Sequence, residues 1–161
     1  GIELVERPTG GGVAVHGSDL SFSVVAPHDP QWPLEALMQG VADALHDGTG
    51  RLGVQTTWTR DAQSRWRIDY CLTEESPYAL MVEGRKLCGL AVRRYPASWL
   101  IQGSMLVRAL PDVFAQAMPA DVRASFQARA ISLEQAAGRA IDEKELVGAL
   151  TGAWRKMWGE V

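Results

Sequence analysis

The sequence predicts an α+β domain in which a mostly antiparallel or mixed β-sheet is followed by packed helices. Residues 20–25 alternate apolar and polar side chains, as expected for a strand with one buried face. From residue 111 onward the apolar positions recur with a period of about 3.6, which is typical of amphipathic helices. Strands early in the chain and helices later are the arrangement of α+β proteins.

The first half of the chain should contain short strands and one long helix. An apolar stripe with helical spacing begins just after Pro33, a residue that is tolerated in the first turn of a helix. Asp47-Gly48 together with Gly50 is expected to end this helix. Strand-like runs occupy residues 13–15, 20–25, 54–58 and 66–72.

The middle of the chain should form a β-hairpin. Glu83-Gly84 separates the apolar run 80–82 from a second run that extends to residue 92, and Gly84 supplies the tight turn. Residues 98–106 should add a further strand, with a break near Gly103.

Helices are expected in the last third. Residues 111–117 and 119–128 should form two short helices, each with a proline near its start. Ser132 with Gln135, and Asp142 with Glu145, have the spacing of capping boxes. The last helix should turn these residues inward: Leu146, Leu150, Ala153, Trp154 and Met157.

The composition disfavours several classes of protein. The 161 residues carry a formal net charge of -3, whereas non-specific nucleic-acid binding needs a basic face. No apolar run approaches the roughly 20 residues of a membrane span, and no signal-peptide pattern opens the chain. Two cysteines, Cys71 and Cys88, fit a reducing cytoplasm better than a disulfide framework. We therefore expect a cytoplasmic protein without nucleic-acid or membrane partners, and no metal among its site residues.

A glycine triplet is the most distinctive local feature of the chain. It lies in Arg7-Pro8-Thr9-Gly10-Gly11-Gly12, and His16 follows shortly afterwards. Glycine permits positive φ and close approach of a ligand to the main chain. The triplet is therefore either a flexible turn or a loop that holds a small acyl or phosphate group, and the flanking polar residues favour the second interpretation.

Three motifs together resemble the biotin/lipoate protein ligase superfamily, in particular its lipoate–protein ligases and octanoyltransferases. The first is the glycine stretch 7–16 followed by Asp19-Leu20-Ser21-Phe22-Ser23. The second is Val82-Glu83-Gly84-Arg85-Lys86-Leu87-Cys88-Gly89, and the third is Ile101-Gln102-Gly103-Ser104-Met105-Leu106. The resemblance covers nearly the whole chain and implies one catalytic domain of this family over residues 1–161.

The resemblance implies transfer of octanoate or lipoate to one lysine of a carrier domain. The donor would be acyl carrier protein, and the acceptor a lipoyl domain or the glycine-cleavage H protein. Lys86 would polarise the acyl carbonyl and stabilise the oxyanion formed during transfer. The substrate-binding positions implied are Arg7, Thr9, Gly10, Gly11, Gly12, His16 and Gly89.

Cys71 distinguishes branches of this superfamily. It precedes Glu83 by twelve residues, which is similar to the branch of octanoyltransferases that carry the acyl group on a cysteine. Its thiolate would attack the donor thioester, and this route needs no cofactor. The alternative is a structural cysteine at the end of a strand. Cys88 is interpreted as a packing residue.

Two other functions remain open. An ATP-dependent lipoate ligase would form a lipoyl-adenylate and require ATP and Mg. A non-catalytic homologue or partner subunit is suggested by departures from the family pattern at Glu6, Gly17 and Gln102. Family members also carry a strand and a helix before the glycine loop, whereas six residues precede Arg7 here, so either the upstream segment lies outside this sequence or the domain has lost these elements.

Overall fold

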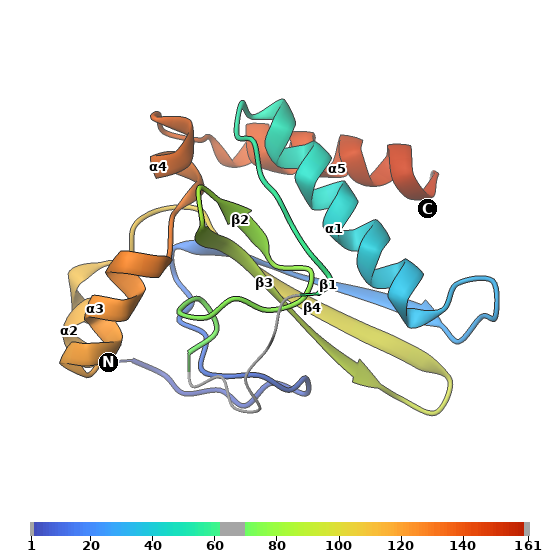
Figure 1. The fold of residues 1–161 in the computed structure, drawn as a ribbon, viewed down its shortest axis with the longest axis horizontal. Coiled ribbons are helices and arrows are strands. Elements are labelled where there is room, and N and C mark those ends of the chain that lie inside the picture. Colours follow the sequence, from blue (N-terminus) through green and yellow to red (C-terminus); the bar gives the residue numbers. More distant parts are fainter. Residues whose placement is uncertain (1, 62–69, 160–161) are drawn as a thin grey trace.

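The computed structural model describes residues 2–61 and 70–159, and within them an antiparallel sheet is flanked by helices (Figure 1). The strands follow the order β1-β4-β3-β2 across the sheet. They are β1 (Asp19–Pro27), β2 (Leu80–Val82), β3 (Arg85–Arg94) and β4 (Ser98–Leu106). The helices are α1 (Leu34–Arg51), α2 (Asp112–Ala117), α3 (Ala120–Arg129), α4 (Leu133–Ala137) and α5 (Glu143–Trp158). The α+β prediction is confirmed.

The two faces of the sheet have different roles. Leu20, Phe22 and Val24 of β1 pack into the main core, which α1 and α5 cover on one side of the sheet (Figure 1). Successive side chains on a strand point to opposite faces. The opposite face therefore carries Ser21, which pairs with Ser104 of β4, and Gly89 of β3, which pairs with Ser104 from the other side. The chain before β1 crosses this polar face, where the candidate site lies.

Small residues let α1 and α5 pack closely. A Cβ placed on Gly48 would lie 2.6 Å from Cδ2 of Leu150 and 3.3 Å from its Cα. The sequence predicts that α1 ends at Asp47-Gly48, but the helix continues to Arg51. Gly48 is therefore a contact residue of the helix pair, and the left-handed turn after the helix belongs to Gly53 (φ +84°).

Gly48→Ala is expected to destabilise the protein by about 1–3 kcal/mol, because the added methyl meets the Leu150 backbone. Gly50→Ala in the same helix is the matched control, since a Cβ there meets nothing within 4 Å. The control should stabilise the protein by about 0.5–1 kcal/mol through helix propensity. Urea unfolding measures both, and equal stability of the two variants would contradict the packing argument.

The hairpin forms as predicted and sets the position of Lys86. Glu83 and Gly84 both have positive φ, at 49° and 75°, as a two-residue turn between right-twisted strands requires. The register between β2 and β3 shifts between Leu80 and Met81, and Lys86 pairs with Met81. Lys86 therefore sits one residue inside β3, close to the turn.

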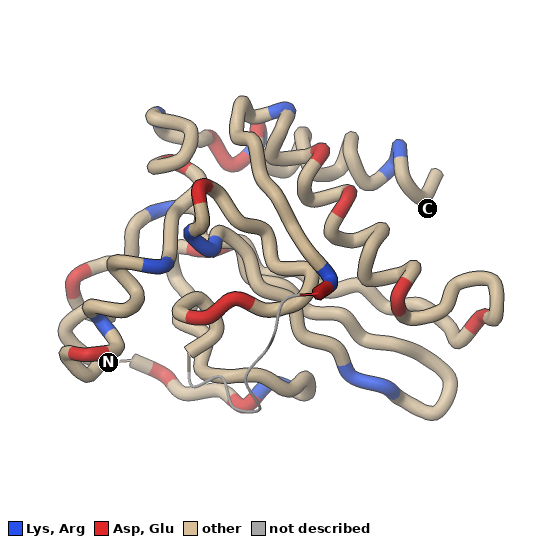
Figure 2. The backbone as a smooth tube through the Cα atoms, in the orientation of Figure 1, with Lys and Arg blue, Asp and Glu red and all other residues tan. Residues whose placement is uncertain are grey.

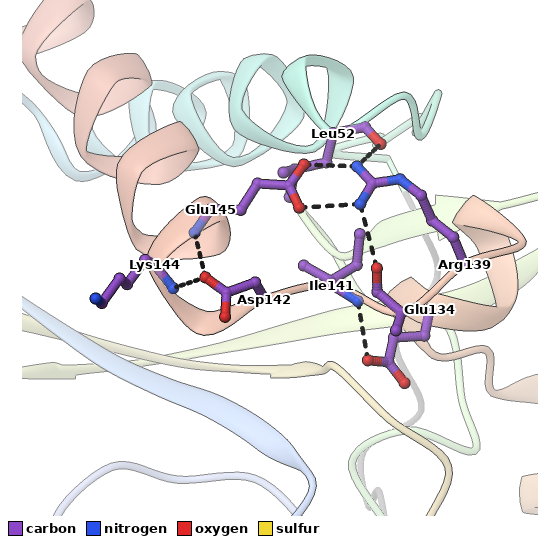
Figure 3. Close-up of polar contacts among 8 residues, drawn as sticks. Leu52, Glu134, Arg139, Ile141, Asp142, Lys144 and Glu145 are labelled. Carbon is purple, nitrogen blue, oxygen red and sulfur yellow. Dashed lines mark hydrogen bonds and ion pairs between the residues drawn. The ribbon is translucent and has the colours of Figure 1, made fainter.

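The helix starts agree with the sequence except at one cap. Ser132 and Gln135 form the predicted reciprocal capping box of α4. At α5 the Asp142 side chain accepts hydrogen bonds from the main-chain N–H groups of Lys144 and Glu145 (Figure 3). The predicted reciprocal bond from Glu145 is wrong, because that carboxylate binds the Arg139 guanidinium at 2.6 and 2.9 Å instead.

Several expected strands are reduced to single bridges. Of residues 13–15, only Val13 pairs with another described residue, Tyr70, because the chain here crosses the face of the sheet and does not extend it. Of residues 54–58, only Thr57 has a strand partner in the described part of the chain, Met81, since β2 offers three residues. Within the expected strand 66–72, residues 66–69 lie outside the described part, and a turn follows Tyr70.

Two further expectations are wrong. β4 runs without a break through Gly103, because the Phe22 ring packs over that glycine and a Cβ there would lie 2.1 Å from Phe22 Cζ. Met157 does not turn inward and is 41% exposed.

Charged residues of both signs are spread over the helices and loops (Figure 2). No helix in the described ranges is long and apolar enough to cross a membrane.

Candidate acyl-transfer site

Cys71 lies in a turn that is fixed on two sides. Its main-chain N–H donates to the carbonyl of Val13 at 2.9 Å, which ties the turn to the glycine-rich segment. The next residue, Leu72, is buried against Leu106 and Ala130. Arg129 at the end of α3 donates to the carbonyl of Thr73 at 3.4 Å. The thiol itself is half-buried and forms no disulfide.

Lys86 is a buried lysine, unlike the solvated lysines usual near turns. Its side chain is only 2% exposed. The Nζ atom donates to the carbonyl of Glu74 at 2.8 Å and to the hydroxyl of Ser76 at 2.9 Å. Burial lowers the pKa of Lys86, although the nearby Cys71 thiol and other acidic groups counteract this.

Gly89 is where these two side chains meet. A Cβ placed on Gly89 would lie 2.7 Å from Cys71 Sγ, 3.3 Å from Lys86 Cε and 3.5 Å from Lys86 Nζ. Any larger residue at this position would displace the thiol. The thiol of Cys88, in contrast, points into the core with no exposed surface, and burial raises its pKa far above the usual range. The expectation that Cys88 is a packing residue is confirmed.

The glycine loop is stabilised by its own flanking residues. Arg7 donates from Nη2 to the carbonyl of Gly12 at 2.9 Å. Gly11 has φ +103°, and a Cβ there would lie 2.7 Å from the Arg7 guanidinium. Thr9 is buried and donates to Oε1 of Gln102 at 2.8 Å. Gln102, a departure from the family motif, thus anchors the loop to β4.

An open groove of about 840 Å³ lies beside the glycine loop. Gly10 and Gly11 line it, together with Ser76, which also contacts Lys86. Its apolar walls come from the start of α1, the segment after Ser76 and the part of β3 beyond its pairing with β2. These wall residues are Leu34, Met38, Pro77, Tyr78, Leu90, Ala91 and Val92. A medium-length acyl chain would find apolar surface here.

His16 belongs to a separate polar cluster. Its Nδ1 lies 2.8 Å from Oδ2 of Asp19, while the ring is half exposed. Asp19 also accepts hydrogen bonds from the hydroxyls of Ser104 and Ser21 and from the main-chain N–H of Gly17. Burial alone would raise the pKa of Asp19, but the hydrogen bonds together hold it below its ordinary value.

Asp19→Asn is expected to reduce stability at neutral pH but not in acid. A lowered carboxyl pKa contributes stability above its ordinary value of 3.8, and this is lost as pH falls through the folded-state value. The gap in unfolding free energy between variant and wild type should therefore narrow below about pH 4. Urea unfolding across pH 2–7 measures this difference in unfolding free energy. Asp121→Asn, on the exposed start of α3, is the control. A gap independent of pH would contradict the account.

The structure brings together only part of the site expected from sequence. Cys71, Lys86 and Gly89 converge, whereas Arg7 and Thr9 bond within the loop and to β4, so their action on a donor stays a prediction. From the sequence, Asp19 and Ser104 are identified only as motif members, and Ser76 is not singled out. In the described part of the chain no three His, Cys, Asp or Glu side chains gather as a metal site.

Comparison with known proteins supports the motif-based expectation. Residues 1–155 match the family model described as the lipoyl protein ligase A/B catalytic domain. Octanoyltransferase LipM of Staphylococcus epidermidis is 28% identical over 97% of this chain and 63% of its own length. The chain therefore spans less than two thirds of this relative.

Solved structures share the fold. Lipoate-protein ligase A bound with ATP superposes with a TM-score of 0.72 at 21% identity, over 94% of this chain and 57% of the ligase. The bipartite lipoate protein ligase of Thermoplasma acidophilum, described with its E2 lipoyl domain, gives a TM-score of 0.67 at 19% identity, over 94% of this chain and 56% of that one. These likenesses establish the architecture.

Proposed function

Because the chain belongs to the lipoyl protein ligase A/B catalytic domain family, we propose that it transfers an octanoyl group to a lysine of a lipoyl carrier domain through a thioester on Cys71. The convergence of Cys71 Sγ and Lys86 Nζ on Gly89 is the observation that carries this proposal. The similarity to octanoyltransferase LipM favours transfer over ATP-dependent ligation.

The first half-reaction loads the enzyme. The Cys71 thiolate attacks the carbonyl carbon of an octanoyl thioester on acyl carrier protein, and a tetrahedral oxyanion forms. The carrier sulfur then leaves as a thiolate, which takes up a proton, and the octanoyl group remains on Sγ. The acyl chain lies in the apolar groove, whose Gly10 and Gly11 wall lets the main chain approach it.

The second half-reaction forms the amide. The neutral amine of the acceptor lysine attacks the Cys71 thioester, Cys71 leaves as a thiolate, and the amine gives up one proton to solvent. No oxidation occurs and no ATP is consumed, so the route needs no cofactor. The acceptor is a lipoyl domain or the glycine-cleavage H protein, as implied by the family and by the lipoyl-domain partner of the Thermoplasma ligase.

Lys86 supplies the positive charge for both steps. An ammonium N–H directed at the carbonyl oxygen stabilises the oxyanion, and in a water-poor site such a donor has a large effect on rate. Its burial and its two fixed partners mean that little reorganisation is needed when the oxyanion forms.

Transfer to a purified lipoyl domain tests the proposal. We expect octanoylation of the domain from octanoyl-carrier protein alone, detected by its gain in mass, with no change on adding ATP and Mg. Acylation that appears only with free octanoate or lipoate, ATP and Mg would show a ligase. No acylation under either condition would show a non-catalytic homologue, and both outcomes would overturn the proposal.

A further inference from the structure

The Lys86 ammonium has one donor more than it has partners among the described residues. An ammonium carries three N–H donors. Two of them go to the Glu74 carbonyl and the Ser76 hydroxyl, at 2.8 and 2.9 Å. Because the three N–H groups are arranged tetrahedrally, two fixed partners also fix the direction of the third.

We propose that Ser76 is a positioning residue, whose hydroxyl keeps the Lys86 ammonium charged and directs its remaining N–H toward the thiol of Cys71. The catalytic consequence rests on the proposed function, whereas the effect on Lys86 itself does not. The Glu74 contact comes from the main chain and persists in any variant. Ser76 is therefore the partner that a substitution can remove.

The segment that carries Ser76 is rigidly attached to the rest of the fold. Tyr78 has φ +60°, a conformation that non-glycine residues rarely adopt, and its N–H donates to the Thr59 carbonyl at 2.8 Å. Its ring stacks on Trp58 with centroids 5.7 Å apart. Trp58 Nε1 in turn donates to Asp43 of α1 at 3.1 Å. Ser76, itself buried, is thus held between Lys86 and this aromatic pair.

The other groups near Lys86 cannot replace the Ser76 hydroxyl. The titratable groups that act on its charge are Cys71, Cys88, Glu74 and Glu75. The Glu74 and Glu75 carboxylates favour the ammonium by their charge, but no hydrogen bond joins the side chains of these four residues to Nζ in the described structure. Arg129, from α3 on the other side, is engaged with the Thr73 carbonyl.

Titration of Lys86 by NMR tests the inference directly. The chain has three lysines, Lys86, Lys144 and Lys156, so protein labelled with ¹³C at lysine Cε gives three resonances, and Lys86→Met assigns the first. In Ser76→Ala the midpoint of Lys86 should fall by about one pH unit, because the charged form loses a hydrogen bond. Lys144 and Lys156 are internal references and should not move.

Further variants make the result decisive. Ser76→Thr keeps the hydroxyl and should restore the wild-type midpoint, and Ser98→Ala, at the start of β4, should leave it unchanged. Ser76→Cys, a weaker acceptor of similar volume, should shift the midpoint downward and takes the place of Ser76→Ala if that variant fails to fold. An unchanged or raised midpoint in the variants that lack the hydroxyl would overturn the inference.

Kinetic assays, combined with the titration of Lys86, distinguish a failure of this inference from a failure of the proposed function. In an active enzyme, Ser76→Ala should lower kcat for octanoyl transfer about tenfold with a much smaller change in KM for the donor, because the oxyanion donor is misdirected while the apolar walls of the groove are kept. Ser76→Thr should recover most of kcat. If wild-type protein shows no transfer but the Lys86 midpoint still falls in Ser76→Ala, the proposed function fails and the positioning role stands.

Discussion

Replacing Cys71 with alanine is expected to abolish octanoyl transfer to the lipoyl domain, with a loss of at least about 10³-fold, because the thioester cannot form without the sulfur nucleophile. The fold should persist, since the turn at Cys71 is held by its main-chain bond to Val13 and by the buried neighbour Leu72. Transfer is measured as mass gain of the lipoyl domain over time.

Cys88→Ala is the matched control for this variant. Cys88 lies on β3 next to Gly89, but its thiol is fully buried, and burial keeps that thiol protonated. The control should retain transfer within a few-fold of wild type while losing some stability to the cavity it creates. Transfer by Cys71→Ala at a rate close to that of Cys88→Ala would exclude the thioester route.

Lys86→Met is expected to lower transfer at least about 100-fold, because it removes the ammonium proposed to stabilise the oxyanion. Unlike most substitutions in a buried site, it should not destabilise the fold. Burial lowers the pKa of Lys86 below 10.5, so the unfolded chain binds this proton more tightly than the folded one. The charged form of Lys86 therefore costs the folded state some stability at neutral pH, which offsets the loss of its two hydrogen bonds, and the variant should keep an unfolding free energy close to that of wild type.

The transfer rate and the unfolding free energy of Lys86→Met together distinguish a catalytic role of the Lys86 charge from a role of its side chain in packing. Lys144→Met, at the exposed start of α5, is the control and should change neither transfer nor stability appreciably. A transfer rate for Lys86→Met within twofold of wild type would remove Lys86 from the mechanism. A large loss of stability, with the remaining folded fraction fully active, would show that the lysine serves the fold alone.

Local sequence patterns predicted those elements whose structure depends on neighbouring residues. The Glu83-Gly84 turn and the Ser132 capping box formed because each satisfies its own hydrogen bonds within a few positions. The segments 13–15 and 54–58 have the composition of strands, but each pairs at a single residue within the ranges that the structure describes. Whether a partner exists depends on the path of the whole chain, which no local pattern contains.

The candidate site, like the fold, was predicted from the sequence only in part. The spacing of Cys71 from the hairpin resembles that of the cysteine-dependent octanoyltransferases, which implied a nucleophile there, and the structure brings Cys71 and Lys86 together at Gly89. The link between Ser76 and Lys86 could not be predicted, because it depends on how the turn after Cys71 folds back over β3. Gly103 was mistaken for a break because only the cross-strand pairing reveals the Phe22 ring packed over it.

Intact-protein mass spectrometry of the enzyme mixed with octanoyl-carrier protein, without ATP, tests the central claim most directly. The account predicts one adduct of about 126 Da (C8H14O) that hydroxylamine removes and that peptide mapping places on Cys71, as a thioester intermediate requires. An unmodified enzyme that nevertheless octanoylates the lipoyl domain, or an adduct on a residue other than Cys71, would contradict it.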